Sequence, residues 1–245
     1  MGAVESYLRV ARSYPFVRAL ASTCLATDRS SEIAARTSSE APSTHQTPRQ
    51  CAPIRPQSGS VRSERVVAMK SQEIAAAIQR VESVLKRRPE VGLHDDAPAI
   101  ARWESGTRVV SSHTNGTQLF TDMPTELGGS GEQVTPGWLV RAGLASCLAT
   151  RIAMGAAAAG FELAILEVSA SSRSDARGLL GMTEASGTPV CAGPRDLQLL
   201  VRIAAPGVSP ERLRTLIEEC NRCSPVSAAL RDAVPITLCI EMDGG

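Results

Sequence analysis

Three stretches of the chain place hydrophobic residues at helical spacing. Each begins at a serine or threonine, and two of them continue with proline at the first helical position, which is typical of a helix start. We expect helices at residues 71–88, 136–159 and 210–222. The second is apolar almost all round, which predicts that it is buried. The sequence Cys223-Ser-Pro-Val then breaks the third helix, and a shorter helix is expected as far as Leu230.

Between the first two helices the period of the pattern changes to two. Short strands are expected at residues 99–104, 107–114 and 118–122, with Asn115-Gly116 as a tight hairpin turn. Three later segments also alternate or are rich in branched apolar residues, and strands are expected there as well: 161–172, 197–204 and 235–242. Helices mixed with short strands joined by hairpins predict an α+β fold for residues 99–245.

Residues 1–68 differ from the rest of the chain. They contain nine Arg, no Lys, five acidic residues and eleven Ser, and the hydrophobic periodicity stops after about Ala26. We interpret them as a disordered or non-native N-terminal extension, with Met69 as a possible working start. A transit peptide is the alternative, because Tyr7 to Leu25 can form a short Arg-bearing amphipathic helix. Residues 69–98 are read as an N-terminal helix and linker.

Composition and charge exclude several classes of function. The chain has 26 basic and 25 acidic residues, a net charge of +1 and only 3% aromatic residues, which argues against nucleic acid as a partner. The sequence has no run of 18 apolar residues, so no membrane span is predicted. Seven cysteines at irregular spacing fit working thiols in a reducing compartment better than a secreted disulfide scaffold. The expected location is therefore cytoplasmic, or organellar if residues 1–68 are a transit peptide.

Several motifs occur in an order that is similar to a known family. They are Glu126-Leu-Gly-Gly129, the helix start Thr135-Pro136, the helical segment Ala145-Ser-Cys-Leu-Ala149 and, near the end, Cys223-Ser-Pro-Val-Ser227. In this order they resemble the osmotically inducible protein C and organic hydroperoxide resistance (OsmC/Ohr) superfamily. The resemblance covers roughly residues 100–242.

The resemblance implies an OsmC-like fold in which curved antiparallel sheets pack on two central helices of an intertwined homodimer. It implies that Cys147 reduces an organic hydroperoxide and that Cys223 then forms a disulfide with it. A dithiol such as a lipoylated protein would return the disulfide to thiols. The family's catalytic arginine comes from the early strands, where Arg102 and Arg108 are both available, and we take Arg108 as the candidate.

One position departs from the family pattern. Peroxidatic members carry a carboxylate directly after the helix-starting proline, and this chain has Gly137 there. Glu126 and Glu132 flank the preceding glycine-rich loop but are more simply read as solvated. The alternative function is therefore a non-catalytic OsmC-like protein that binds or senses through its thiols.

The residues themselves offer other readings of the thiol chemistry. A buried Cys147 needs a cation to favour its thiolate, and Arg151 (one helical turn on) or Arg141 are candidates. Cys220-Asn-Arg-Cys223 closes a helix, whereas a thioredoxin-like pair opens one, and it supplies only two of the ligands that zinc needs. The remaining cysteines are expected to be inert: Cys24, Cys51, Cys191 and Cys239. We expect no metal and no cofactor.

The glycine-rich loop at residues 128–131 has neither a P-loop nor a dinucleotide-binding pattern. It is expected to be a flexible connection to the buried helix.

Overall fold

The computed structural model describes residues 71–242. The predicted extension at residues 1–68, with Cys24, Cys51 and the possible start at Met69, lies outside the described residues. One compact unit runs from Val67 to Pro235, and residues 236–242 belong to a second unit. The two units are described separately.

The first sheet contains three antiparallel strands in the order β1-β2-β3. They are β1 (Ile100–Ser105), β2 (Arg108–Ser112) and β3 (Gln118–Thr121). The turns between them contain Gly106 and Gly116, which have positive φ values of 53° and 92° and so adopt a conformation that favours glycine. These strands confirm the hairpins expected from the period-two pattern.

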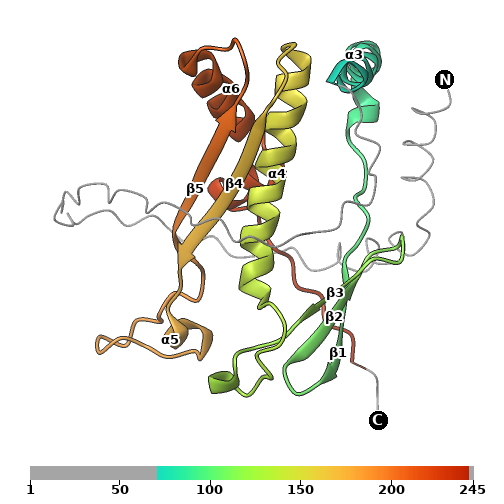
Figure 1. Ribbon diagram of the computed structural model, residues 1–245. Coiled ribbons are helices and arrows are strands. Elements are labelled where there is room, and N and C mark those ends of the chain that lie inside the picture. The colour runs from blue at the N-terminus through green and yellow to red at the C-terminus, as the bar shows by residue number, and fades with distance from the viewer. Residues whose placement is uncertain (1–70, 243–245) are drawn as a thin grey trace, which may run out of the picture. The chain divides into compact units, whose positions relative to one another are not determined.

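The second sheet is the antiparallel pair β4 (Ile165–Arg173) and β5 (Arg195–Ala204). It lies beside the long helix α4 (Pro136–Ala158), as Figure 1 shows, and β4 contacts that helix. Thr135 begins α4, because its side chain accepts a hydrogen bond from the Trp138 amide at 3.3 Å. Helices and antiparallel sheets together make this an α+β fold, as expected.

The core forms along one face of α4. Its buried residues Leu144, Leu148, Ile152 and Ala156 recur every four residues, which places them on a single stripe of the helix. Leu148 and Ile152 cluster with the buried Cys220. Hydrophobic residues of β4, β5 and α6 pack against this cluster: Leu166, Val168, Leu199, Val201, Ile203, Leu216 and Ile217.

Three further helices contact α4. Helix α6 (Pro210–Arg222) begins at Ser209, and the short helix α7 (Pro225–Arg231) follows it directly. Helix α3 (Ser71–Arg87) contacts α4 as well, and none of its residues is buried. A 3₁₀ turn, η1 (Pro89–Gly92), ends α3. The predicted helices are thus confirmed to within two residues of their ends.

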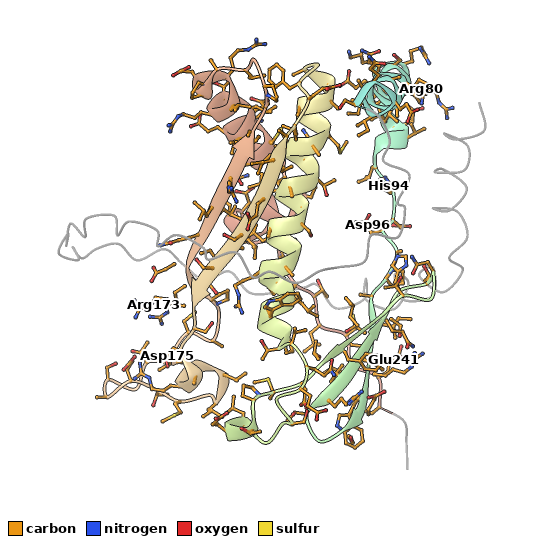
Figure 2. All side chains as sticks on the ribbon, viewed as in Figure 1. Arg80, His94, Asp96, Arg173, Asp175 and Glu241 are labelled. Atoms are coloured by element: carbon orange, nitrogen blue, oxygen red, sulfur yellow. The ribbon has the colours of Figure 1, made fainter. Side chains whose placement is uncertain are left out.

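Besides η1, two short elements were not expected from the sequence. Within the predicted loop at residues 175–194, Asp175 caps the short helix α5 (Ala176–Leu179) and also pairs with Arg177 at 2.7 Å. Figure 2 shows Asp175 beside Arg173, at the end of β4 away from α6. The second is the 3₁₀ turn η2 (Thr125–Leu127) in front of the glycine-rich loop.

The predicted final strand at residues 235–242 is wrong for this structure. Residues 236–242, the described part of the second unit, form no strand, and Ile236 and Leu238 are 95% and 81% exposed. Alternating hydrophobic and polar residues allow a segment to join a sheet, but a strand forms only when the edge of a neighbouring strand supplies hydrogen bonds.

Helix α4 is long and apolar enough to span a membrane by length and composition. It is also the element that β4, α3, α6 and α7 all contact. These contacts make it the central core helix, but its buried residues lie on one face, so the prediction that the helix is buried is confirmed for that face only.

Candidate functional site

The candidate site centres on a contact between helix α4 and the start of α7. Ser224 Oγ donates a hydrogen bond to Cys147 Sγ at 3.2 Å. Cys147 lies near the middle of α4 and is partly buried, whereas Ser224 is fully buried. The contact therefore places a hydroxyl donor against the thiol that the sequence singled out.

The break between α6 and α7 puts Ser224 in this place. Cys223 ends α6 and Ser224 precedes Pro225, which is the first residue of α7. Because proline has no amide hydrogen and cannot continue α6, the chain turns here and Ser224 meets α4. The helix start that the sequence predicted thus also builds the site.

Cys223, the predicted disulfide partner, is next to this contact but does not make it. Its side chain is exposed, and Ser224 is the residue that faces Cys147. Ser224 was missed as a site residue. A signal was present, since Ser224 follows Cys220 by four residues and so continues the apolar stripe of α6 toward α4.

Cys220 packs deeply between α6 and α4. It is 1% exposed, and its S–H donates to the Arg151 carbonyl oxygen at 3.3 Å. Burial raises the pKa of the Cys220 thiol, and the charge of Arg151 only partly opposes this. Cys220 is therefore a protonated core residue, packed in the buried cluster with Leu148 and Ile152.

The candidate arginines have other neighbours in the single chain. Arg108 pairs with Glu104 at 2.8 Å and lies over the Phe120 ring at 5.1 Å from its centroid. Arg141 Nη1 donates to Ser172 Oγ at 3.3 Å. Among the described residues the structure therefore brings no predicted arginine into a hydrogen bond with Cys147.

Arg151 lies one turn beyond Cys147 on α4. Its Nε is buried and has no hydrogen-bond partner among the described residues. Its charge acts on the Cys220 thiol. Two neighbouring hydrogen bonds therefore join this part of α4 to the end of α6 and the start of α7. Cys220 donates to the Arg151 carbonyl, and Ser224 donates to Cys147.

Gly137 has open space around it. A Cβ atom added there would lie 3.9 Å from Arg141 Nη1 and 4.0 Å from Thr135 Oγ1, which are ordinary contact distances. A larger side chain therefore fits at the start of α4, directed toward Arg141. The chain lacks the family carboxylate although its backbone has room for one.

The glycine-rich loop is held more firmly than expected. Asp122 is buried, and its carboxylate accepts hydrogen bonds from Thr107 Oγ1, the Met123 amide, and the amide and hydroxyl of Ser130. Gly129 has no room for a Cβ, which would overlap the Met123 carbonyl. These hydrogen bonds could not be predicted from the sequence, because the pattern only places Asp122 at the end of the strand expected at residues 118–122.

The other predicted residues lie apart from this contact. Cys191, which was expected to be inert, is exposed, and Glu126 and Glu132 are solvated. Cys239 was also expected to be inert, and it is disulfide-bonded. Within residues 71–242 no three His, Cys, Asp or Glu side chains are grouped to hold a metal ion.

Comparisons with known proteins point to one family. The family model for OsmC-like protein matches residues 129–238, a range that includes Cys147 and Ser224. The comparison with curated proteins gave no match.

Solved structures of the same group are similar at low identity. The organic hydroperoxide resistance protein OsmC of Legionella pneumophila is 23% identical, with a TM-score of 0.41 over 55% of this chain and 89% of that chain. The OsmC-like protein of Mycoplasma pneumoniae is 16% identical, with a TM-score of 0.46 over 56% of this chain and 88% of that chain. An organic hydroperoxide resistance protein of Elizabethkingia anophelis is 22% identical, with a TM-score of 0.41 over 56% and 89%.

Proposed function

Because residues 129–238 match the family model for OsmC-like protein, we propose that the protein is a thiol-dependent peroxidase that reduces organic hydroperoxides. The observation that carries the proposal is the contact of 3.2 Å between Cys147 and Ser224, both within the matched residues. A thiol with a hydroxyl donor beside it is suited to react as a thiolate, and the thiolate is the nucleophile in peroxide reduction.

The first step oxidises Cys147. Its thiolate attacks one peroxide oxygen, the O–O bond breaks, and the sulfur becomes a sulfenic acid. The departing alkoxide takes up a proton and leaves as an alcohol. The peroxide accepts two electrons, which come from the sulfur.

Cys223 is the proposed resolving thiol. Its thiolate attacks the sulfenic sulfur, the S–O bond breaks, and hydroxide leaves as water after protonation. The product is a Cys147–Cys223 disulfide. Cys223 suits this role because it is exposed and ends a helix, where the local backbone movement needed for disulfide geometry is least costly.

A dithiol would complete the cycle by giving two electrons to the disulfide and becoming a disulfide itself. We take a lipoylated protein as the reductant class, a homodimer as the working state and the cytoplasm as its location. In such a dimer Arg108 would serve the Cys147 of the second copy, because in its own chain it pairs with Glu104.

The second candidate is a non-catalytic protein that binds or senses through the same thiols. Gly137 favours it, because a site without the carboxylate has lost one group that the family's peroxidases use. The thiol pair would then be oxidised once as a signal and would not turn over.

Purified full-length chain mixed with tert-butyl hydroperoxide and dithiothreitol separates the two candidates. A peroxidase consumes many equivalents of hydroperoxide, and Cys147→Ser abolishes this consumption. In the absence of dithiothreitol, Cys223→Ser still reduces one equivalent but forms no Cys147–Cys223 disulfide on mass spectrometry.

The exposed Cys191 provides the matched control, and Cys191→Ser should behave as the wild type. Consumption of a single equivalent with disulfide formation would favour the sensor. No consumption and no disulfide would rule out both thiol roles.

A further inference from the structure

Within residues 71–242, three helices begin with serine or threonine followed by proline, and the start of one differs from the other two. The side chains of Thr135 and Ser209 cap their helices, accepting hydrogen bonds from the amide three residues later at 3.3 and 3.4 Å. Ser224 makes no such cap bond. Its hydroxyl donates to Cys147 Sγ instead. An N-cap serine ordinarily accepts a hydrogen bond from an amide in the first turn of its helix, whereas the Ser224 side chain contacts the thiol.

The surroundings of Ser224 give this contact weight. The residue is fully buried, and burying a hydroxyl is unfavourable unless it forms a hydrogen bond. Its backbone is held independently of its side chain: the Ser224 amide donates to Asn221 O at 3.3 Å, and the Ala228 amide donates to Ser224 O at 2.9 Å. The side chain is therefore not needed to start α7.

We propose that Ser224 is a positioning residue for Cys147, donating its O–H to the Cys147 thiolate and holding that sulfur in place for reaction. This inference rests on the proposed peroxidase function and deepens it. A hydrogen bond to an ionised group is stronger than one between neutral groups, so the contact is suited to hold the sulfur while it reacts as a thiolate.

The inference also bears on how Cys147 is resolved. A hydroxyl cannot form a disulfide, so the residue in direct contact with the reactive sulfur cannot resolve its sulfenic acid. Cys223 is adjacent in the chain and exposed. It must therefore displace Ser224 from Cys147 after oxidation, and the break between α6 and α7 is where the chain has to move.

Alkylation measures the thiolate without any peroxide turnover. The rate at which iodoacetamide modifies Cys147 in the full chain is followed by mass spectrometry between pH 5 and pH 10. Replacing Ser224 by alanine should move the midpoint of this profile to higher pH and slow alkylation at pH 7 about tenfold, the effect of losing one hydrogen bond to a charged group. Ser224→Thr keeps the hydroxyl and should restore the wild-type profile.

The matched control is Ser227→Ala. Ser227 is buried in the same short helix, and its hydroxyl has no partner among the described residues. None of these replacements changes a charge, so the charged groups around Cys147 are the same in every variant. Ser227→Ala should keep the wild-type midpoint.

The outcomes separate the inference from the function on which it rests. If the wild type reduces hydroperoxide but Ser224→Ala keeps its alkylation midpoint and its rate, the positioning role is overturned and the peroxidase stands. If the midpoint moves while the wild type consumes no hydroperoxide, Ser224 stabilises the thiolate and the peroxidase proposal fails. Should Ser224→Ala fail to fold, Ser224→Val against Ser224→Thr gives the same comparison at equal side-chain size.

Discussion

Gly155 and Cys220 lie against each other where α4 meets α6. A Cβ added to Gly155 would lie 2.8 Å from Cys220 Sγ and 3.0 Å from Leu216 Cδ1. The two helices can approach this closely only because residue 155 has no side chain. The same close approach brings the α6–α7 junction, and with it Ser224, onto α4.

Gly155→Ala is therefore expected to destabilise the fold. Overpacking a core costs about 1–3 kcal/mol, which exceeds the roughly 0.5–1 kcal/mol that alanine gains over glycine in a helix. Urea denaturation measures the change in the free energy of unfolding. Gly143→Ala on the same helix is the control, because nothing lies within 4 Å of its added Cβ, and it should stabilise the chain.

The double variant Gly155→Ala with Cys220→Ala tests the cause. Removing the sulfur makes room for the new methyl group, so the combined cost should be smaller than the sum of the two single costs. Strict additivity would show that the cost of Gly155→Ala arises elsewhere.

A carboxylate can be added to the site at residue 137. Gly137→Glu places an acid in the first turn of α4, where it interacts favourably with the helix dipole and with Arg141 one turn on. If the proposed peroxidase is limited by the missing carboxylate, its kcat/KM for tert-butyl hydroperoxide should rise. General acid–base groups contribute about 100-fold or more, so a rise of about tenfold is a conservative expectation.

Gly137→Gln is the control for Gly137→Glu, because it has the same size and helix propensity without the charge. It should gain stability but no activity. Equal gains in activity for both variants would attribute the effect to the helix and not to the carboxylate.

The sequence predicted much of the fold because its signals are local. Thr135-Pro136 and the apolar run after it are enough to define α4, and Asn115-Gly116 is enough to define a hairpin. The contact between Cys147 and Ser224 joins helices far apart in the chain, so the local pattern places Ser224 on the stripe of α6 but does not show that it meets Cys147. The same holds for residues 236–242, whose alternation shows what the segment can form but not which edge it would join.

The Asp122 network makes stability depend on pH. Hydrogen bonds from Thr107, then from Ser130 and Met123, hold the pKa of the Asp122 carboxyl well below its usual range. A depressed pKa stabilises the folded state fully above the unfolded value of about 3.9, and this contribution is lost as the pH falls through the folded value. Asp122→Asn should therefore lower the urea midpoint at pH 7, and the difference from wild type should narrow below about pH 4.

Unfolding is measured at pH 7, 5, 4 and 3 for both proteins. The exposed Asp95 supplies the control, and Asp95→Asn should match the wild type throughout. If the difference in urea midpoint between Asp122→Asn and wild type stays constant down to pH 3, Asp122 acts through its shape and not through its charge.

The first sheet has an apolar surface that a second copy is expected to cover. Trp103 and Leu119 share one face of the sheet, because their partners Val109 and Ser111 are two residues apart on β2, and they are 72% and 51% exposed. Sedimentation should find a dimer of the full chain, and Trp103→Glu should shift it toward monomer because burying a charge without a partner is unfavourable. Leu180→Glu, at a comparably exposed leucine beyond α5, should leave the dimer intact.

A shared site makes a further prediction that dimerisation alone does not. If Arg108 of one copy serves Cys147 of the other, chains with Arg108→Ala and chains with Cys147→Ser are each inactive alone. Co-expression then forms mixed dimers in which one of the two sites has both residues. With random pairing the mixture should recover about a quarter of the wild-type activity. No recovery in a sample whose mixed dimers are confirmed by native mass spectrometry would show that Arg108 does not serve the Cys147 of the other copy.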